Sequence, residues 1–170
     1  MSRTKTTIPP FDLAAPGQVA PDFTLPDTHG TPVQLSALRG APVLLVFFPF
    51  AFSRLCHQEL TGLNEQLDTF AALDAEVLAI SCDPLHSLRA WGDQEGFGLT
   101  LLSDFWPHGQ VAEAYGAFDD EAGHAGRGSV LIDAGGAIAW STLSPPGRTR
   151  SLTEHVDAVR ALAAARVEEP

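Results

Sequence analysis

Cysteine and lysine are scarce in this sequence. Its 170 residues include two cysteines, Cys56 and Cys82, and a single lysine, Lys5. Two cysteines cannot form the disulfide framework of a small secreted domain. There is no C-x-x-C motif, which argues against a dithiol redox centre and a structural zinc site. The six histidines show no ligand spacing, so we expect neither a bound metal nor a cofactor.

Positive charge and long apolar runs are also scarce. The sequence has 10 basic and 21 acidic residues, and the resulting net charge of −11 argues against nucleic-acid binding. The apolar run at residues 43–48 is too short to cross a bilayer and is closed by Pro49, so no membrane span is expected. Residues 1–5 are not followed by an apolar segment, so we expect no secretory signal and a cytoplasmic protein.

The hydrophobic pattern predicts a single α/β domain. At 170 residues with 45% hydrophobic content, the chain is long enough to bury a sizeable core. The periodicity predicts, in order, a hairpin at 20–35, a buried strand at 43–48, a helix at 53–73, a buried strand at 76–81, a helix at 86–95, a short strand at 99–103, a short helix at 110–115, a hairpin at 128–140 and an amphipathic helix at 153–166.

This order of elements resembles the thioredoxin-like arrangement. We therefore expect a thioredoxin-like sandwich with a central mixed sheet, an N-terminal β-hairpin extension and flanking helices. Residues 1–16, which include Thr and Pro, are expected to form a flexible N-terminal arm. The domain is expected to span residues 17–166, followed by a C-terminal tail at 167–170.

Cys56 lies at the junction between the strand at 43–48 and the helix that follows it. Ser53 is a suitable N-cap, because its side-chain oxygen can accept a backbone N–H two or three residues further on. Cys56 would then lie in the first helical turn, where unpaired N–H groups and the helix dipole favour an anion. Such a thiol can ionise well below the pH at which a free thiol does. The sequence therefore predicts a thiolate at position 56 at neutral pH.

The segment Pro49-x-x-x-Ser53-x-x-Cys56 resembles the active-site motif of the peroxiredoxins, Pro-x-x-x-[Thr/Ser]-x-x-Cys. A second feature is Arg127, which opens a predicted strand where that family has its active-site arginine. The resemblance covers about residues 17–165. The segments that most resemble the alkyl hydroperoxide reductase E subgroup, which uses one cysteine, are 47–49, 56–60, 102–109 and 115–116.

The resemblance implies a thiol-dependent peroxidase that reduces hydrogen peroxide and organic or lipid hydroperoxides, with peroxynitrite as a further candidate. Cys56 would be the nucleophile and would become a sulfenic acid. Arg127 would stabilise the thiolate and hydrogen-bond the peroxide, while Ser53 would orient it. Pro49, which has no N–H, would shield the sulfur from water.

Two further residues receive supporting roles from the resemblance. Glu59 is expected to orient Arg127, and the alternative is an ordinary acid in the first turn of a helix. Trp106 is expected to form a wall near the site, and the alternative is an ordinary core residue. Without the resemblance, Arg127 itself could be a surface residue at the start of a strand.

The second cysteine, Cys82, raises the question of how the sulfenic acid on Cys56 is reduced. Resolving cysteines four or five residues after the nucleophile are absent, because Leu60 and Thr61 occupy those positions. We therefore expect a one-cysteine mechanism with an external thiol or redoxin as reductant, of the mycothiol and mycoredoxin, thioredoxin or glutaredoxin type. The alternatives are resolution through Cys82, a peroxide sensor or redox relay, and a non-catalytic thioredoxin-like binding domain. The resemblance also implies a homodimer.

Overall fold

A five-stranded mixed sheet forms the centre of the computed structural model, which describes residues 11–168. Along the sheet, the strands are β5 (Thr100–Ser103), β4 (Glu76–Ser81), β3 (Val43–Phe47), β8 (Arg127–Ile132) and β9 (Ile138–Ser144). Strands β3, β4 and β5 run parallel, whereas β8 is antiparallel to both of its neighbours. All residues of β3 are buried, which explains why this strand is apolar on both faces.

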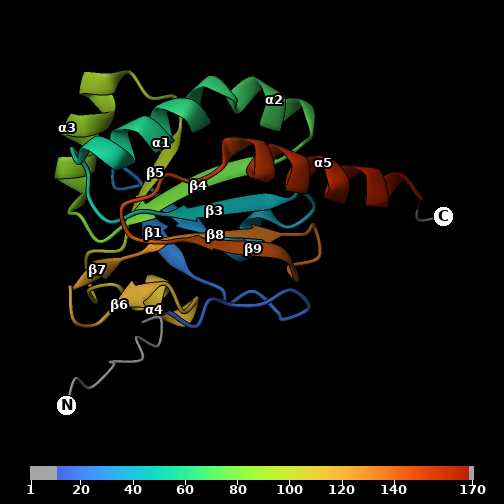
Figure 1. The fold of residues 1–170 in the computed structure, drawn as a ribbon, viewed down its shortest axis with the longest axis horizontal. Coiled ribbons are helices and arrows are strands. Elements are labelled where there is room, and N and C mark those ends of the chain that lie inside the picture. Colours follow the sequence, from blue (N-terminus) through green and yellow to red (C-terminus); the bar gives the residue numbers. More distant parts are fainter. Residues whose placement is uncertain (1–10, 169–170) are drawn as a thin grey trace, which may run out of the picture.

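Each face of the sheet packs against its own apolar cluster. One face is covered by α1 (Arg54–Glu65), α2 (Leu67–Ala72), α3 (Leu85–Glu95) and α5 (Leu152–Glu168) (Figure 1). The other face carries α4 (Gln110–Ala114) and the small hairpin of β6 (Phe118–Asp119) and β7 (His124–Ala125). Hairpin β1 (Thr24–Pro26) and β2 (Pro32–Gln34) is followed by the 3-10 helix η1 (Leu35–Leu38).

The expected elements are present, with three differences. The helix predicted at 53–73 is divided at Gln66, whose backbone angles (φ −99°, ψ 6°) leave the helical range. Just before this break, the Asn64 side chain accepts the N–H groups of Gly98 and Leu99 at 2.8 and 3.2 Å. These bonds tie the end of α1 to the segment before β5. The β6–β7 hairpin and the helical form of η1 were not expected from the sequence.

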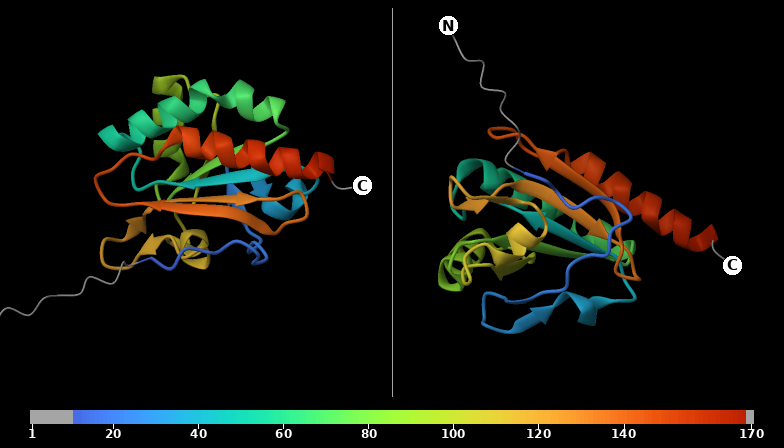
Figure 2. Two further views of the ribbon diagram at one scale, coloured as in Figure 1. Left: turned by 45° about the vertical axis from the view of Figure 1, so that its right-hand side comes forward. Right: turned by 90° about the horizontal axis from the view of Figure 1, so that it is seen from below.

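The chain ends lie partly outside the described residues. Residues 1–10 of the expected arm and 169–170 of the expected tail belong to the undescribed part. Residues 11–16, which we call the N-terminal strap, run along the sheet face opposite to the long helices (Figure 2). Its Ala14 N–H donates to the Tyr115 carbonyl at 2.9 Å. Among residues 11–168, no helix has the length and apolar character that a bilayer crossing requires.

Candidate active site

Cys56 is the third residue of α1 and is fully buried. Ser53 is the N-cap as predicted, and its Oγ accepts the Cys56 N–H at 3.3 Å. No acidic residue occupies the first turn of α1, so the positive end of the helix dipole is not offset there. The Cys56 sulfur therefore lies in the first turn of α1, at the positive end of the helix dipole.

The turn between β3 and α1 is held from the neighbouring strand. Pro49 is half-buried two residues after the end of β3, and Phe52 has a positive φ of 66°, which is uncommon for a residue with a side chain. The Ala51 N–H donates to Asp83 Oδ2 at 2.8 Å, and Ser81 Oγ donates to the same oxygen at 2.6 Å. Asp83 therefore fixes the turn that delivers Cys56.

Arg127 reaches the sulfur from the first position of β8. Its Nη1 lies 3.7 Å from Cys56 Sγ and 2.6 Å from Glu59 Oε2. The side chains of Arg127 and Glu59 are only 9% and 2% exposed. The structure thus brings together four of the residues named from the sequence, Ser53, Cys56, Glu59 and Arg127, although Arg127 lies 71 positions after Cys56.

A second arginine, Arg150, holds the other oxygen of Glu59. The Arg150 backbone N–H donates to Glu59 Oε1 at 2.9 Å, and its Nε lies 3.7 Å from the same oxygen, a charge pair too long for a hydrogen bond. Its Nη2 donates to the Phe47 carbonyl. Burial lowers the pKa of Arg150 to about 10, while the charge of Glu59 acts in the opposite direction. Arg150 is therefore still a cation at neutral pH.

A buried histidine completes this network. Arg150 Nη1 donates to Ser129 Oγ at 3.3 Å, and Ser129 Oγ lies 2.7 Å from His155 Nε2. His155 Nδ1 lies 2.6 Å from the Ser151 carbonyl, which can only accept, so Nδ1 carries the proton and Nε2 accepts from Ser129. Burial, together with the charge of Arg150, lowers the pKa of His155 to about 4. His155 is thus neutral at pH 7.

Sequence reasoning missed Asp83, Ser129, Arg150 and His155. Arg150 follows a Pro- and Gly-containing loop after β9, and no spacing relates it to Cys56. The only signal for His155 was its place in the helix predicted at 153–166. These contacts arise from tertiary packing and not from a local motif.

Cys82 is buried in the other half of the molecule. It belongs to the apolar cluster that includes Tyr115, whereas Cys56 belongs to the cluster beneath the long helices. Burial raises the pKa of the Cys82 thiol to about 12, and the nearby carboxylate of Asp104 adds to this effect. Cys82 is therefore a neutral thiol on the far side of the sheet from Cys56.

Trp106 lies at the surface and is 81% exposed, which excludes the alternative that it is an ordinary core residue. It borders a surface hollow with Asp104 and Gln110, and Cys56 does not line that hollow. Asp104 accepts the N–H groups of Val111 and Ala112 at 3.1 and 2.9 Å and so holds the start of α4. Within this chain, the structure does not bring Trp106 to the sulfur.

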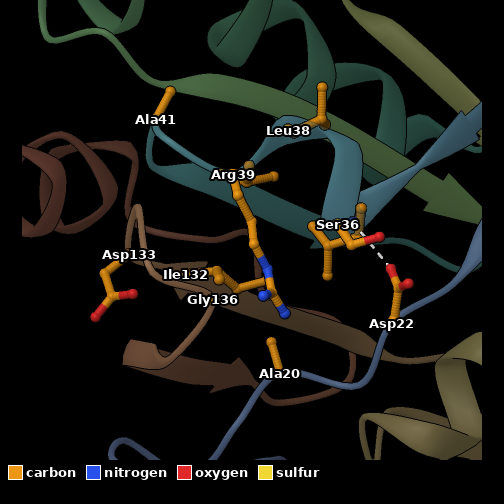
Figure 3. A pocket seen from close by; sticks show the side chains of 11 residues that line it. Ala20, Asp22, Ser36, Leu38, Arg39, Ala41, Ile132, Asp133 and Gly136 are labelled. Carbon is orange, nitrogen blue, oxygen red and sulfur yellow. Dashed lines mark hydrogen bonds between the residues drawn. The ribbon is translucent and has the colours of Figure 1, made fainter.

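A small cavity at the opposite end of the sheet is unrelated to Cys56. Its volume is about 10 Å³, which is room for about one water molecule, and Arg39 lies across it (Figure 3). Val43, the first residue of β3, lines it, whereas Cys56 lies in α1, the helix that follows the other end of that strand. This cavity is therefore not a peroxide site.

Three comparisons with known proteins identify the family and the fold of this chain. Residues 16–141 match the AhpC/TSA family. The chain is 46% identical over 149 residues to alkyl hydroperoxide reductase E of Mycobacterium tuberculosis, covering 87% of this chain and 97% of that protein.

Among solved structures, the crystal structure of peroxidoxin BcpB from M. tuberculosis matches with a TM-score of 0.77 at 30% identity, over 88% of this chain and 96% of that one. Reduced 2-Cys peroxiredoxin of Plasmodium vivax matches with a TM-score of 0.82 at 25% identity, over 91% and 85%. These likenesses confirm the predicted thioredoxin-like fold.

Proposed function

Because the chain belongs to the AhpC/TSA family of peroxiredoxins, which are thiol-dependent peroxidases, we propose that Cys56 is the sulfur that attacks the peroxide. The observation that carries this proposal is the buried contact of 3.7 Å between Cys56 Sγ and Arg127 Nη1. The contact supports the proposal, because a guanidinium beside the sulfur can stabilise the negative charge that develops during the reaction.

In the proposed first step, the Cys56 thiolate attacks the terminal oxygen of the hydroperoxide. The S–O bond forms as the O–O bond breaks, and two electrons pass from sulfur to the departing alkoxide or hydroxide. That oxygen takes up a proton and leaves as an alcohol or water, and Cys56 remains as a sulfenic acid. Because the leaving oxygen carries developing charge, hydrogen bonds from Arg127 stabilise the transition state.

The remaining site residues take positioning roles in this proposal. Ser53 fixes the first turn of α1 and orients the peroxide, and Pro49 shields the sulfur from water. Glu59 orients Arg127 through its bond of 2.6 Å. Trp106 could form a wall of the site only through a contact with a second chain, because within this chain it does not reach Cys56.

For the second half of the reaction we propose a one-cysteine mechanism. An external thiol displaces water from the Cys56 sulfenic acid to give a mixed disulfide, and a second thiol then releases the Cys56 thiolate and leaves with the first as a disulfide. Cys82 is poorly suited to this task, because it lies in the opposite cluster and its pKa is raised to about 12. The candidate reductants are mycothiol with mycoredoxin, thioredoxin and glutaredoxin-type systems.

The side chains near the turn support a preference for organic substrates. Phe50 and Phe52 lie in the turn before α1, four and two residues before Arg54, and are 48% and 54% exposed. Exposed apolar side chains near the site favour lipid or organic hydroperoxides over hydrogen peroxide. Peroxynitrite is a further candidate substrate, which rests on the family and not on these side chains. We further propose a homodimer that acts in the cytoplasm.

The test is peroxide consumption by the wild type, Cys56→Ser and Cys82→Ser proteins, with a sulfenic-acid trap and mass spectrometry after one equivalent of peroxide. The proposal predicts a trapped adduct on Cys56, no turnover in Cys56→Ser and normal first-step chemistry in Cys82→Ser. Unchanged turnover in Cys56→Ser would overturn it. Competition among hydrogen peroxide, cumene hydroperoxide, a fatty-acid hydroperoxide and peroxynitrite ranks the substrates.

A further inference from the structure

The glycines on either side of Arg127 lie against the N-terminal strap. A Cβ atom at Gly126 would fall 2.5 Å from Cζ of Phe11, and one at Gly128 would fall 3.0 Å from Cδ1 of Leu13. Neither glycine has a positive φ, so glycine is required here by space and not by backbone conformation. The strap therefore packs closely against the backbone immediately before and after Arg127.

The alternation of side chains along β8 separates the two contacts. Arg127 and Ser129 point toward the helix-covered face, where they meet Glu59 and Arg150. A Cβ atom at Gly126 or Gly128 would project to the opposite face, as does the side chain of Val130, which belongs to the cluster that packs against Leu13. The strap thus packs against the backbone around Arg127 on the sheet face opposite to the Arg127 side chain.

This end of β8 is not paired with the central strand β3. The pairing of β8 with the central strand β3 ends at Ser129, two residues short of Arg127. Beyond that point, Arg127 is paired with Ser144 of the edge strand β9, and the Gly126 N–H donates to the Ala117 carbonyl at 2.7 Å. The strap is therefore well placed to fix where the guanidinium lies.

We propose that Phe11 is a positioning residue for Arg127, acting through its close packing on Gly126. The proposal deepens the function proposed above and rests on it, because the effect of Phe11 is exerted on the contact between Arg127 and Cys56. The Phe11 ring fills the space that a side chain at position 126 would otherwise occupy. Without that ring, the first residues of β8 gain freedom and Arg127 is held less firmly against the sulfur.

The experiment is a double-mutant cycle of Phe11→Ala, Gly126→Ala and both together, in the full chain carrying Cys82→Ser. The readouts are the rate of sulfenic-acid formation on Cys56 and the pH profile of Cys56 alkylation. Since small misplacements at an active site can cost up to about a hundredfold in rate, we expect each single variant to lose about tenfold. The alkylation profile should move to higher pH, which loss of global stability alone would not cause.

Coupling between the two sites is the decisive result. Because either change relieves or disrupts the same contact, the double variant should be no slower than Phe11→Ala alone. Multiplied losses of about a hundredfold in the double variant would overturn the proposal. So would a Phe11→Ala protein with the rate and alkylation profile of the parent.

Two variants serve as matched controls and should keep the parent rate. Val19→Ala shortens a side chain that is 76% exposed shortly after the strap, and Gly98→Ala adds a methyl group with only ordinary contacts. A loss in Val19→Ala equal to that in Phe11→Ala would also overturn the proposal. If the parent itself fails to form a sulfenic acid on Cys56, the proposed function fails, whereas the alkylation profile still tests Phe11 separately.

Discussion

Cys56 and Cys82 are both buried and free, yet they belong to apolar clusters on opposite faces of the same five-stranded sheet. Strands β3 and β4, which lead to these two residues, are parallel neighbours, so their ends meet at the same edge of the sheet. The sheet itself lies between the two thiols. This separation is the reason we expect one reactive sulfur and no disulfide between Cys56 and Cys82.

The first prediction concerns Cys82. Oxidation with one equivalent of peroxide should give no disulfide between Cys56 and Cys82, because the thiols lie on different faces and burial keeps Cys82 protonated. Cys82→Ser should retain turnover when an external thiol is supplied. Non-reducing peptide mapping checks this, and a linked peptide pair containing both cysteines would show that the enzyme resolves through Cys82.

The second prediction concerns Glu59, which is bonded to Arg127 and Arg150. Glu59→Gln leaves two buried cations without their shared carboxylate, so the free energy of unfolding should fall by about 3 kcal/mol. Peroxide reduction should slow as well, because Arg127 loses the group that orients it. Denaturant unfolding and stopped-flow kinetics measure the two effects.

Glu95→Gln is the matched control for Glu59→Gln. Glu95 pairs with His57 at 3.3 Å, but His57 is 43% exposed. Removing such a surface pair should cost about 1 kcal/mol or less and leave the kinetics unchanged. Equal losses in the two variants would show that Glu59 has no special role.

The third prediction concerns the N-cap. Ser53→Ala removes the acceptor of the Cys56 N–H and should lower the free energy of unfolding by about 1 kcal/mol. The rate of sulfenic-acid formation should also fall, because the first turn of α1 loses its cap and the peroxide loses the hydroxyl group that orients it. Ser53→Thr keeps that hydroxyl and should restore both quantities. A normal rate in Ser53→Ala would reduce Ser53 to a cap alone.

The fourth prediction concerns pH and stability. The pKa of His155 falls from 6.5 to about 4 on folding, chiefly through burial. Between these values the unfolded state holds more protons, so the contribution of His155 to stability falls as the pH is lowered through this range. The full loss is at most about 3 kcal/mol. His155→Gln should therefore flatten the acid limb of stability against pH.

Asp104 provides the opposite control. Its pKa is raised from 3.8 to about 6 by burial, so here the folded state holds more protons between those values. Its contribution is present at low pH and is lost as the pH rises through 6. Asp104→Asn should make the acid limb steeper. Chemical denaturation between pH 4 and 7 tests both variants, and equal slopes in all three proteins would contradict the assignment.

Local patterns predicted much of this fold, because they reflect short-range physics. The apolar run of β3 and the helical spacing after Ser53 placed Cys56 correctly at a helix start. The break at Gln66 was not predicted, because Asn64 is drawn to the backbone of Gly98, a contact that only the folded chain creates.

The site was predicted only where a motif was available. Pro49, Ser53 and Cys56 lie within one turn and helix start, and Arg127 was found through the family resemblance. Arg150 and His155 could not be found, because their link to Glu59 and Ser129 comes from packing α5 and its preceding loop on the sheet. Likewise, the reason for glycine at positions 126 and 128 is visible only in the folded chain, where Phe11 lies against Gly126 and Leu13 lies against Gly128.

The rate of sulfenic-acid formation on Cys56, measured in the Cys82→Ser protein with and without Arg127→Gln, tests the central claim most directly. Removing one donor that stabilises a developing oxyanion typically costs about a hundredfold or more. We predict a loss of that order at neutral pH, with the fold retained. An Arg127→Gln protein that reacts as fast as its parent would contradict the account.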